Sequence, residues 1–316
     1  MRSDMKLIIT GGTGYIGGRL VNYLESEIGL QVNVGTRRLQ YENVPESNAK
    51  FVYTDYSSIE ELKRVCVGID VVIHVAGMNA NDCIVDPLSA IEVNTIQTAR
   101  LLRAAILSGV KRFIYFSTAH VYNLHGLINE DSCPLNLHPY ATSHRAAEDA
   151  VRFAHKHGEI EGIVVRLSNS FGAPVSRAAN CWSLLANDLC RQAITMRNMT
   201  LRSSGMQRRD FISMTDVCRA THHLLSIPLL FSDNIVFNIG GNWSPTIWDF
   251  ACQIQAMCKE IVGFEPQLFR GGPVDDEVPT ELDYSIDKLK GTGFVLISNH
   301  DEEVGQLLRY CQDTFA

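Results

Sequence analysis

The chain has 316 residues, 46% of them hydrophobic and 20% charged, which suits one large domain or two joined lobes with a sizeable core. Its formal net charge of -7 argues against a surface that neutralises nucleic-acid phosphates. No apolar run approaches the roughly 20 residues of a membrane helix, and the first residues lack a signal-peptide layout. We therefore expect a soluble, cytoplasmic protein with neither nucleic acid nor membrane as a partner.

Short runs rich in Ile and Val alternate with longer segments of helical period in the first half of the chain. This alternation is typical of βαβ units and predicts an α/β fold, a Rossmann-type doubly wound parallel sheet. The expected strands cover residues 6–10, 31–35, 50–53, 71–75, 113–117 and 162–167, and the expected helices cover residues 15–25, 58–65, 90–108 and 143–156.

The composition of the sequence changes after Leu167: apolar runs become scarcer, and all three Trp residues occur in this part. We expect residues 1–170 to form a dinucleotide-binding domain and residues 171–316 to form a smaller α/β substrate-binding lobe. Short helices are expected at 182–196, 216–225 and 248–262, and a strand at 235–240 is expected to return to the main sheet.

A glycine-rich turn joins the first expected strand to the first helix. Gly11, Gly14 and Gly17 form G-x-x-G-x-x-G, with Tyr15 and Ile16 between the last two glycines. Glycines allow a tight turn, let backbone N–H groups approach a pyrophosphate and let the helix pack against the strand. The motif therefore predicts a dinucleotide site at this first βα turn.

The end of the second expected strand bears on the choice of cofactor. An acid here accepts from the adenosine ribose of NAD, whereas an arginine accommodates the 2′-phosphate of NADP. The chain has Arg37 and Arg38 and no acid. We therefore favour NADP (NADPH) and keep NAD as possible; the alternative is that both arginines only solvate a loop.

Further motifs follow in a recognisable order along the chain. They are His74-Val75-Ala76-Gly77, Asn94, Phe116-Ser117-Thr118-Ala119-His120-Val121-Tyr122, Pro139-Tyr140-Ala141-Thr142-Ser143-His144, Arg166-Leu167-Ser168-Asn169, Arg209-Asp210-Phe211-Ile212 and Asn238-Ile239-Gly240. With the glycine turn, this order resembles the extended short-chain dehydrogenase/reductase family, specifically its NAD(P)-dependent nucleotide-sugar epimerase/dehydratase branch. The resemblance runs from about residue 6 to about residue 295.

The resemblance implies a role for several residues toward the cofactor. Asp55 matches the position that hydrogen-bonds the adenine amine, and Ala76 and Gly77 match the loop under the cofactor ribose and phosphates. Asn94 matches a helix position that supports the active site, and residue 144 matches the position that holds the nicotinamide ribose.

The resemblance also implies the reacting groups. Thr118 falls on the Ser/Thr that hydrogen-bonds the substrate oxygen, and Tyr140 falls on the general acid/base. Asn169, Arg209 and Arg270 match residues that hold a nucleotide diphosphate, for which arginine supplies planar, charged donors. The implied substrate is a nucleotide sugar.

The chain departs from the family at His144, where the pattern is Tyr-x-x-x-Lys. A tyrosine has a pKa near 10, so a nearby cation helps it to transfer a proton near neutral pH. Three interpretations follow: a protonated His144 substitutes for lysine, or His120 takes part in proton transfer, or the chain binds cofactor while catalysing poorly.

The residues after Thr118 bear on the type of reaction. In the 4,6-dehydratases of this branch an Asp-Glu pair follows the threonine, but here Ala119 and His120 follow it. Dehydration is therefore the least favoured activity, and epimerisation at C4 through a ketone or reduction of a keto-sugar by NADPH is favoured. The alternatives are a cofactor-binding protein with weak or no catalysis, and an NADPH-dependent reductase of a non-nucleotide carbonyl compound.

The sequence predicts no metal site, because its His and Cys residues lack ligand spacing. Five histidines are interpreted as surface or core-edge residues: His74, His125, His138, His222 and His223. The resemblance also implies a homodimer through the helices at 90–108 and 143–156, which match the face that forms the dimer interface in relatives. Its apolar positions would be Leu101, Leu102, Ala105, Ala146, Ala147 and Ala150.

Overall fold

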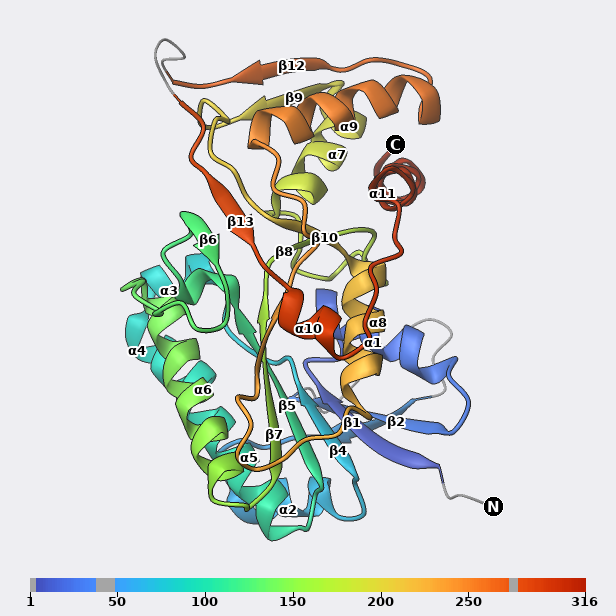
Figure 1. Ribbon diagram of the computed structural model, residues 1–316. Coiled ribbons are helices and arrows are strands. Elements are labelled where there is room, and N and C mark those ends of the chain that lie inside the picture. The colour runs from blue at the N-terminus through green and yellow to red at the C-terminus, as the bar shows by residue number, and fades with distance from the viewer. Residues whose placement is uncertain (1–3, 38–48, 273–277) are drawn as a thin grey trace. The chain divides into compact units, whose positions relative to one another are not determined.

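The computed structural model describes residues 4–37, 49–272 and 278–316 (Figure 1). These residues form two compact units, each built from several segments of the chain. Unit 1 takes its residues from Met1–Asn123, Glu130–Leu167 and Thr221–Phe237, and unit 2 takes its residues from Leu124–Asn129, Ser168–Ala220 and Asn238–Ala316. The chain thus passes between the units at Leu167, near the sequence boundary, and again around residues 221–237.

A seven-stranded parallel sheet forms the centre of the fold, in the order β11-β7-β5-β4-β1-β2-β3 (Figure 1). Leu7, Ile8 and Ile9 of the first strand are fully buried, as expected for a strand covered on both faces. The order runs outward from β1 in both directions, which is the doubly wound topology that the sequence predicts. The strands are β1 (Met5–Thr10), β2 (Leu30–Thr36), β3 (Lys50–Tyr53), β4 (Val71–His74), β5 (Arg112–Thr118), β7 (Glu161–Leu167) and β11 (Val236–Ile239).

Helices cover both faces of this sheet. The helices α2 (Ile59–Cys66), α5 (Gln97–Leu107) and α6 (Pro139–Lys156) share one apolar core with the strands. On the other face, α1 (Tyr15–Glu25) packs its buried Leu20, Val21 and Leu24. The expected strand at 235–240 joins the sheet as β11, where the Val164 N–H donates to the carbonyl of Ile235.

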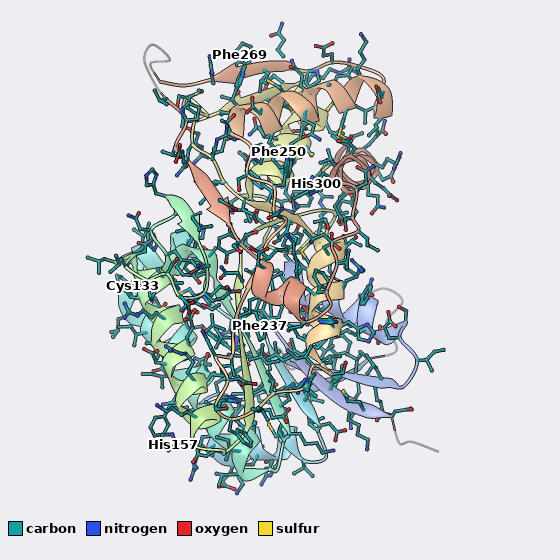
Figure 2. The ribbon with its side chains drawn as sticks, viewed as in Figure 1. Cys133, His157, Phe237, Phe250, Phe269 and His300 are labelled. Atoms are coloured by element: carbon teal, nitrogen blue, oxygen red, sulfur yellow. The ribbon has the colours of Figure 1, made fainter. Side chains whose placement is uncertain are left out.

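Unit 2 is smaller and rich in aromatic contacts. Its core lies among α7 (Leu185–Met196), α9 (Ile247–Ile261) and α11 (His300–Phe315). Phe250 (Figure 2) packs edge-on against Phe211 with ring centroids 4.7 Å apart, and Trp243 stacks on His300 at 4.2 Å. The other elements are β6 (Gly126–Ile128), β8 (Asn169–Phe171), β9 (Asn198–Leu201), β10 (Phe211–Ser213), α8 (Met214–Leu224), β12 (Gln267–Arg270), β13 (Leu282–Tyr284) and α10 (Asp287–Gly291).

Three helices differ from their expected bounds by three residues or more at their start. The expected helix at 90–108 is divided into α4 (Pro87–Ala90), a π-helix over Ile91–Ile96 and α5. It starts early because Asp86 accepts from the Ser89 N–H and Pro87 occupies the first turn. Helix α6 starts at Pro139 for the same reason, so Tyr140 lies inside the helix, and α7 starts at Leu185 instead of residue 182.

Before these helices, α3 (Ala80–Val85) is capped by Asn79, and a 3₁₀ helix, Ala119–Val121, follows β5. Within the described ranges, no helix has both the length and the apolar character to cross a bilayer.

Candidate active site

The site residues expected in unit 1 gather at one edge of the sheet. In a parallel sheet the carboxyl ends of all strands lie at the same edge, where α/β proteins place their ligands. The helices that carry Asn94, Tyr140 and His144 contact one another at this edge. The residues that follow the strands there are Gly11 after β1, Arg37 after β2, Asp55 after β3, Ala76 and Gly77 after β4, and Thr118 at the end of β5.

Glycine is required in this turn because two segments of backbone approach each other closely. Gly11 has a φ of +72°, and a Cβ on it would lie 2.7 Å from the Ala76 nitrogen. A Cβ on Gly17 would lie 2.2 Å from the carbonyl oxygen of Gly11. The turn closes through a 2.9 Å hydrogen bond from the Gly14 N–H to the same carbonyl. Only glycine fits the first and last positions of the motif.

The first turn of α1 suits an anionic group. The helix begins at Tyr15 after Gly14, which has no side chain to cap it, and the first turn holds no acid. The positive end of the helix dipole at such a turn favours a negatively charged ligand, as in other pyrophosphate sites. Tyr15 is buried and Ile16 half-buried, so both residues also anchor the helix. This turn fits a dinucleotide.

The adenosine end of the expected cofactor site is partly described. Asp55 accepts from the backbone N–H and hydroxyl of Ser57, at 2.8 and 2.7 Å. These two hydrogen bonds lower the pKa of Asp55, so its carboxylate is ionised at neutral pH and can accept further bonds. Arg37 follows β2 and is exposed, whereas Arg38 lies outside the described residues.

Asn94 ties the loop after β4 to helix α6. Its Oδ1 accepts from the Met78 N–H at 2.7 Å, and its Nδ2 donates to the Ser143 hydroxyl at 3.0 Å. Thr95 adds a 2.8 Å hydrogen bond to the Ser143 carbonyl. Asn94 lies in the π-helix, a local distortion that is frequent at functional sites, and it is 1% exposed. It thus holds the loop beside the residue that precedes His144.

Thr118 and Tyr140 form the centre of the candidate active site. The Thr118 Oγ1 accepts from the His120 N–H at 3.1 Å, which leaves its hydrogen for donation. Burial raises the pKa of Tyr140, and the nearby Thr118 hydroxyl has a smaller, opposite effect on it. The His120 ring lies edge-on to Tyr140, with centroids 6.2 Å apart. Tyr140 is therefore held in its protonated form.

His144 lies beside Tyr140 but carries no charge at neutral pH. The two rings are edge-on at 4.6 Å, and His144 Nδ1 lies 2.7 Å from the Tyr115 hydroxyl. Burial, with a smaller contribution from His120, lowers the pKa of His144 to about 3. The interpretation that a protonated His144 replaces the lysine charge therefore does not fit this structure.

Sequence reasoning missed the residues beneath the site. Along β5, Tyr115 and Ser117 point to one face, and along α6 His144 and Glu148 are one turn apart. The two sets meet in register: Tyr115 bonds His144, and Ser117 donates to Glu148. Period-two and period-four spacing of polar residues in β5 and α6 is the signal that would have found them.

Other charged and polar side chains are also buried beneath the site. Glu148 is 1% exposed and pairs with Arg166 at 2.6 Å, and Arg166 donates to the Tyr122 hydroxyl at 2.7 Å. His74 is also buried, at 1% exposure, so the interpretation of His74 as a surface or core-edge residue was wrong. Its position at the end of β4, a central strand, explains the burial.

The three residues expected to hold a nucleotide diphosphate lie in unit 2. The Asn169 Nδ2 donates to the carbonyl of Asp210 at 2.9 Å, which places it beside Arg209. Arg209 bonds Gln207 at 3.2 Å, and burial lowers its pKa. Arg270 lies 4.3 Å above the ring of Trp248. Neither arginine forms an ion pair with a described carboxylate, an arrangement suited to an anionic ligand.

The apolar positions proposed for a dimer surface are mostly internal. Leu101, Leu102, Ala105 and Ala147 are at most 4% exposed and belong to the core between the helices and the sheet. These four positions were therefore wrongly assigned to an interface. They are buried because α5 and α6 direct them at β5 and at each other.

The chain was compared with known proteins. A family model described as "NAD dependent epimerase/dehydratase family" matches residues 7–240. A dTDP-D-glucose 4,6-dehydratase of Mus musculus is 27% identical over 299 residues, which cover 90% of this chain and 78% of that protein.

Solved structures show the same fold. The UDP-glucuronic acid 4-epimerase from Bacillus cereus, in complex with UDP-glucuronic acid and NAD, has a TM-score of 0.80 and 23% identity, covering 98% of this chain and 99% of its own. RMD from Pseudomonas aeruginosa, complexed with NADPH, has a TM-score of 0.79 and 21% identity over 98% of this chain and 99% of its own. Both have the Rossmann-type architecture found here.

Proposed function

Because this chain belongs to the NAD dependent epimerase/dehydratase family, we propose that it is an NAD(P)-dependent enzyme acting on a nucleotide sugar at the level of alcohol and ketone. The favoured reactions are epimerisation and reduction of a keto-sugar. The observation that carries the proposal is the placement of Thr118 beside Tyr140 at the carboxyl edge of a sheet whose first turn fits a dinucleotide.

Each of the two hydroxyl groups has a distinct task. Thr118, whose oxygen accepts from the His120 N–H, donates its hydrogen to the reacting sugar oxygen. Tyr140 takes the proton of a substrate alcohol during oxidation, or donates its own to a carbonyl during reduction. When bound, a nicotinamide dinucleotide supplies the acceptor or the donor of hydride.

The neutral state of His144 affects the proton transfer. Without a cation beside it, Tyr140 has a pKa above its ordinary value, because burial disfavours the phenolate. The protonated phenol is the form needed to donate to a carbonyl. This state supports the reductive direction over the initial oxidation of an alcohol near neutral pH.

The substrate class rests on unit 2. Arg209 and Arg270 have no ion-pair partner among the described carboxylates, and burial lowers the pKa of Arg209. A diphosphate would supply the missing negative charge and planar acceptors for both guanidinium groups. Asn169, next to Arg209 through Asp210, would donate to the same ligand.

We favour NADP over NAD because Arg37 follows β2 and no acid stands at that point of the sequence. The similar structures include one with NAD and one with NADPH in their names, so both cofactors belong in the experiment. Asp55, Ala76, Gly77 and Asn94 are the other residues that we propose around the cofactor.

A second candidate is a cofactor-binding protein with weak catalysis, favoured by the uncharged His144. Dehydration also returns as a reaction to be tested, because a 4,6-dehydratase is among the relatives. The expectation against it rests only on Ala119 and His120 following Thr118.

The deciding experiment is a titration of the protein with NADPH and NADH, followed by nicotinamide fluorescence, with and without UDP, GDP, CDP and dTDP. Matching nucleotide sugars are then assayed for epimerisation, reduction and dehydration by NMR of the sugar. We expect preferential binding of NADPH, a second site for one nucleoside diphosphate, and turnover of its sugar. Binding of cofactor without any nucleoside diphosphate would contradict the nucleotide-sugar assignment.

We also propose a homodimer, now on a different surface. Ile84, Val85 and Leu88, on α3 and α4, are 57%, 84% and 78% exposed, and apolar side chains gathered on adjacent helices suit a protein contact. Sedimentation at micromolar concentration should show a dimer, and Val85→Glu should shift it to monomer. A wild-type monomer would contradict the proposal.

A further inference from the structure

Asp210 is a buried acid between two of the residues proposed for the diphosphate. It follows Arg209 and precedes strand β10, which pairs with β8, the strand that begins at Asn169. Asp210 is 2% exposed, and its backbone carbonyl accepts from the Asn169 Nδ2 at 2.9 Å. Because burial disfavours a charge, an ionised carboxylate in such a place needs hydrogen-bond donors.

The donors come from a tight turn of the backbone after β11. The Gly241 N–H donates to Oδ1 of Asp210 at 2.9 Å, and the Trp243 N–H donates to Oδ2 at 3.1 Å. Between them, Asn242 has a φ of +52°, and turns with a left-handed residue let neighbouring N–H groups converge on one anion. Asp210 therefore supplies, from within the chain, the anion that this turn binds.

The turn packs so closely on Asp210 that two of its positions exclude side chains. A Cβ on Gly240 would lie 2.5 Å from the Asp210 Oδ1, and a Cβ on Gly241 would lie 1.9 Å from the carbonyl oxygen of Phe211. The hydrogen bonds are thus part of a dry contact, in which a lost acceptor is not replaced by water.

The same turn leads back to the backbone of Arg209. The Arg209 N–H donates to the carbonyl of Pro245 at 3.3 Å, and the Phe211 N–H donates to the carbonyl of Trp243 at 3.0 Å. This segment thus runs beside Arg209, and the Asp210 side chain fastens its start. A displaced turn would therefore displace Arg209.

We propose that Asp210 is a positioning residue of the nucleoside-diphosphate site. Its ionised carboxylate holds the turn that supports Arg209, and its carbonyl oxygen orients the Asn169 amide by engaging one of the two Nδ2 hydrogens. Both residues are thereby set toward one anionic ligand, although Asp210 itself is buried beneath them. The inference rests on the proposed function in one respect, that unit 2 binds a nucleoside diphosphate.

The charge of Asp210 responds to pH near neutrality. Burial raises its pKa to about 7, and the hydrogen bonds from Gly241 and Trp243 oppose this shift less strongly. Protonation removes the negative charge that these N–H groups favour. The site should therefore bind its ligand more weakly as the pH falls through about 7.

Other charged or titratable groups surround Asp210 on its own segment, on β13 and on α11. The arginines stay charged near neutral pH, and burial lowers the pKa of His300, so that this ring is neutral at pH 7. All of these groups are retained in a variant at position 210, so a comparison with the wild type isolates Asp210. They are Arg208, Arg209, Tyr284 and His300.

Hydrogen exchange tests the hold on the turn without any ligand. Asp210→Asn is compared with Asp216→Asn, because Asp216 is also buried and also accepts from two backbone N–H groups, elsewhere in unit 2. Asparagine keeps one acceptor oxygen but presents an NH₂ group to the second donor. Asp210→Asn should lower the protection of the Gly241 and Trp243 amides about tenfold, and Asp216→Asn should not. Unchanged protection in Asp210→Asn would overturn the inference.

Ligand binding tests the link from Asp210 to its two neighbours. The probes are UDP-, GDP-, CDP- and dTDP-glucose, because a diphosphate diester carries no phosphate that titrates near neutral pH. Isothermal titration at pH 8 should show affinity reduced about tenfold in Asp210→Asn and within about twofold of wild type in Asp216→Asn. Between pH 8 and pH 6 the ionised fraction of Asp210 falls about tenfold, and wild-type affinity should fall by up to this factor. Asp210→Asn should change much less.

The outcomes separate the inference from the proposed function. A wild type that binds none of the four probes contradicts both. If the wild type binds a probe and Asp210→Asn binds it equally well, only the inference fails. It also fails if Asp216→Asn loses as much affinity as Asp210→Asn, which would show a general loosening of unit 2. Wild-type binding that is independent of pH would contradict the role given to the charge of Asp210.

Discussion

The glycine turn and the inner face of α6 both adjoin the proposed cofactor site, but they are built on different principles. In the turn, contact is made by backbone, and side chains are excluded: a Cβ on Gly17 would lie 2.2 Å from a carbonyl oxygen. On α6, contact is made by buried side chains whose hydrogen bonds must all be satisfied by neighbours, as between His144 and Tyr115.

This difference explains why one region keeps the family pattern and the other departs from it. A steric requirement of the backbone can be met only by glycine. A buried side chain can be replaced if its partners satisfy the new donor and acceptor. His144 stands where the family motif has lysine, and Tyr115 on the facing strand provides a hydrogen-bond partner for it. The predictions below test this contrast.

The largest effect is expected on α6 from Tyr140→Phe. Removal of the phenol deletes the proposed acid/base, and such groups contribute about 10²- to 10⁴-fold to rate. Turnover should fall by about 10³-fold while cofactor affinity stays within about twofold of wild type. The exposed Tyr53, changed to Phe, is the control. Wild-type turnover in Tyr140→Phe would remove this residue from the mechanism.

In the turn, the informative pair is Gly11→Ala and Gly158→Ala. Both glycines have a φ of +72°, but a Cβ on Gly11 meets Ala76 at 2.7 Å, whereas a Cβ on Gly158 meets nothing within 4 Å. Each variant should lose about 1–2 kcal/mol of unfolding free energy from backbone strain, and Gly11→Ala should lose more because its Cβ also overlaps the Ala76 backbone. Only Gly11→Ala should also weaken cofactor binding, by about 10²-fold.

Urea denaturation and fluorescence titration give the two quantities separately. Equal cofactor affinity in Gly11→Ala and Gly158→Ala would mean that the shape of the turn does not matter for binding. The turn would then not differ from α6 in the way described above.

The contrast between local backbone sterics in the turn and long-range side-chain contacts on α6 also decides what could be predicted from the sequence. The seven strands of the main sheet follow from apolar patterns that act within a few residues and were predicted correctly, whereas the six short strands outside that sheet in the described ranges were not predicted. The glycine turn follows from sterics that also act locally. The start of α6 was missed by four residues because Pro139 begins the helix before the apolar pattern does. The charge of His144 could not be predicted, because its pKa depends on burial by elements distant in sequence.

The hydrogen-bond partner of His144 illustrates the same limit. Tyr115 lies 29 residues away in the sequence, and only the packing of α6 on β5 brings the two together. The pairing of Ser117 with Glu148 in the same register depends on that packing too. Sequence therefore named the candidate reacting residues, and the fold was needed to give their protonation states.

In unit 2, Arg209 forms no ion pair with a described carboxylate, and Arg209→Gln tests the role that we propose for it toward a diphosphate. Removal of a charged donor to a diphosphate should weaken binding of the matching nucleoside diphosphate about thirtyfold. Arg208→Gln is the matched control, because Arg208 donates to the carbonyl of Ser244. Isothermal titration measures both affinities. Equal losses in the two variants would show a general effect of charge and no specific site at Arg209.

The last prediction concerns the protein's stability and follows from the uncharged state of His144. In the unfolded chain this histidine takes up a proton near pH 6.5, but in the folded chain only at about pH 3. Between these values the unfolded state binds more protons, so the free energy of unfolding falls as the pH falls. One such group contributes about 1.4 kcal/mol per pH unit. The stabilisation is complete above pH 6.5 and is lost toward pH 3.

His144→Asn isolates this contribution, because asparagine does not titrate and retains hydrogen-bonding atoms near the position of Nδ1. Urea denaturation at pH 7 and pH 5 should show that the wild type loses about 2 kcal/mol more than the variant over this interval. His74, whose pKa is also lowered to about 3, and Asp210, whose pKa is raised to about 7, contribute to both proteins and cancel in the difference. An equal loss in the two proteins would mean that His144 is protonated in the folded state, and α6 would then offer the same kind of charge as the family's lysine.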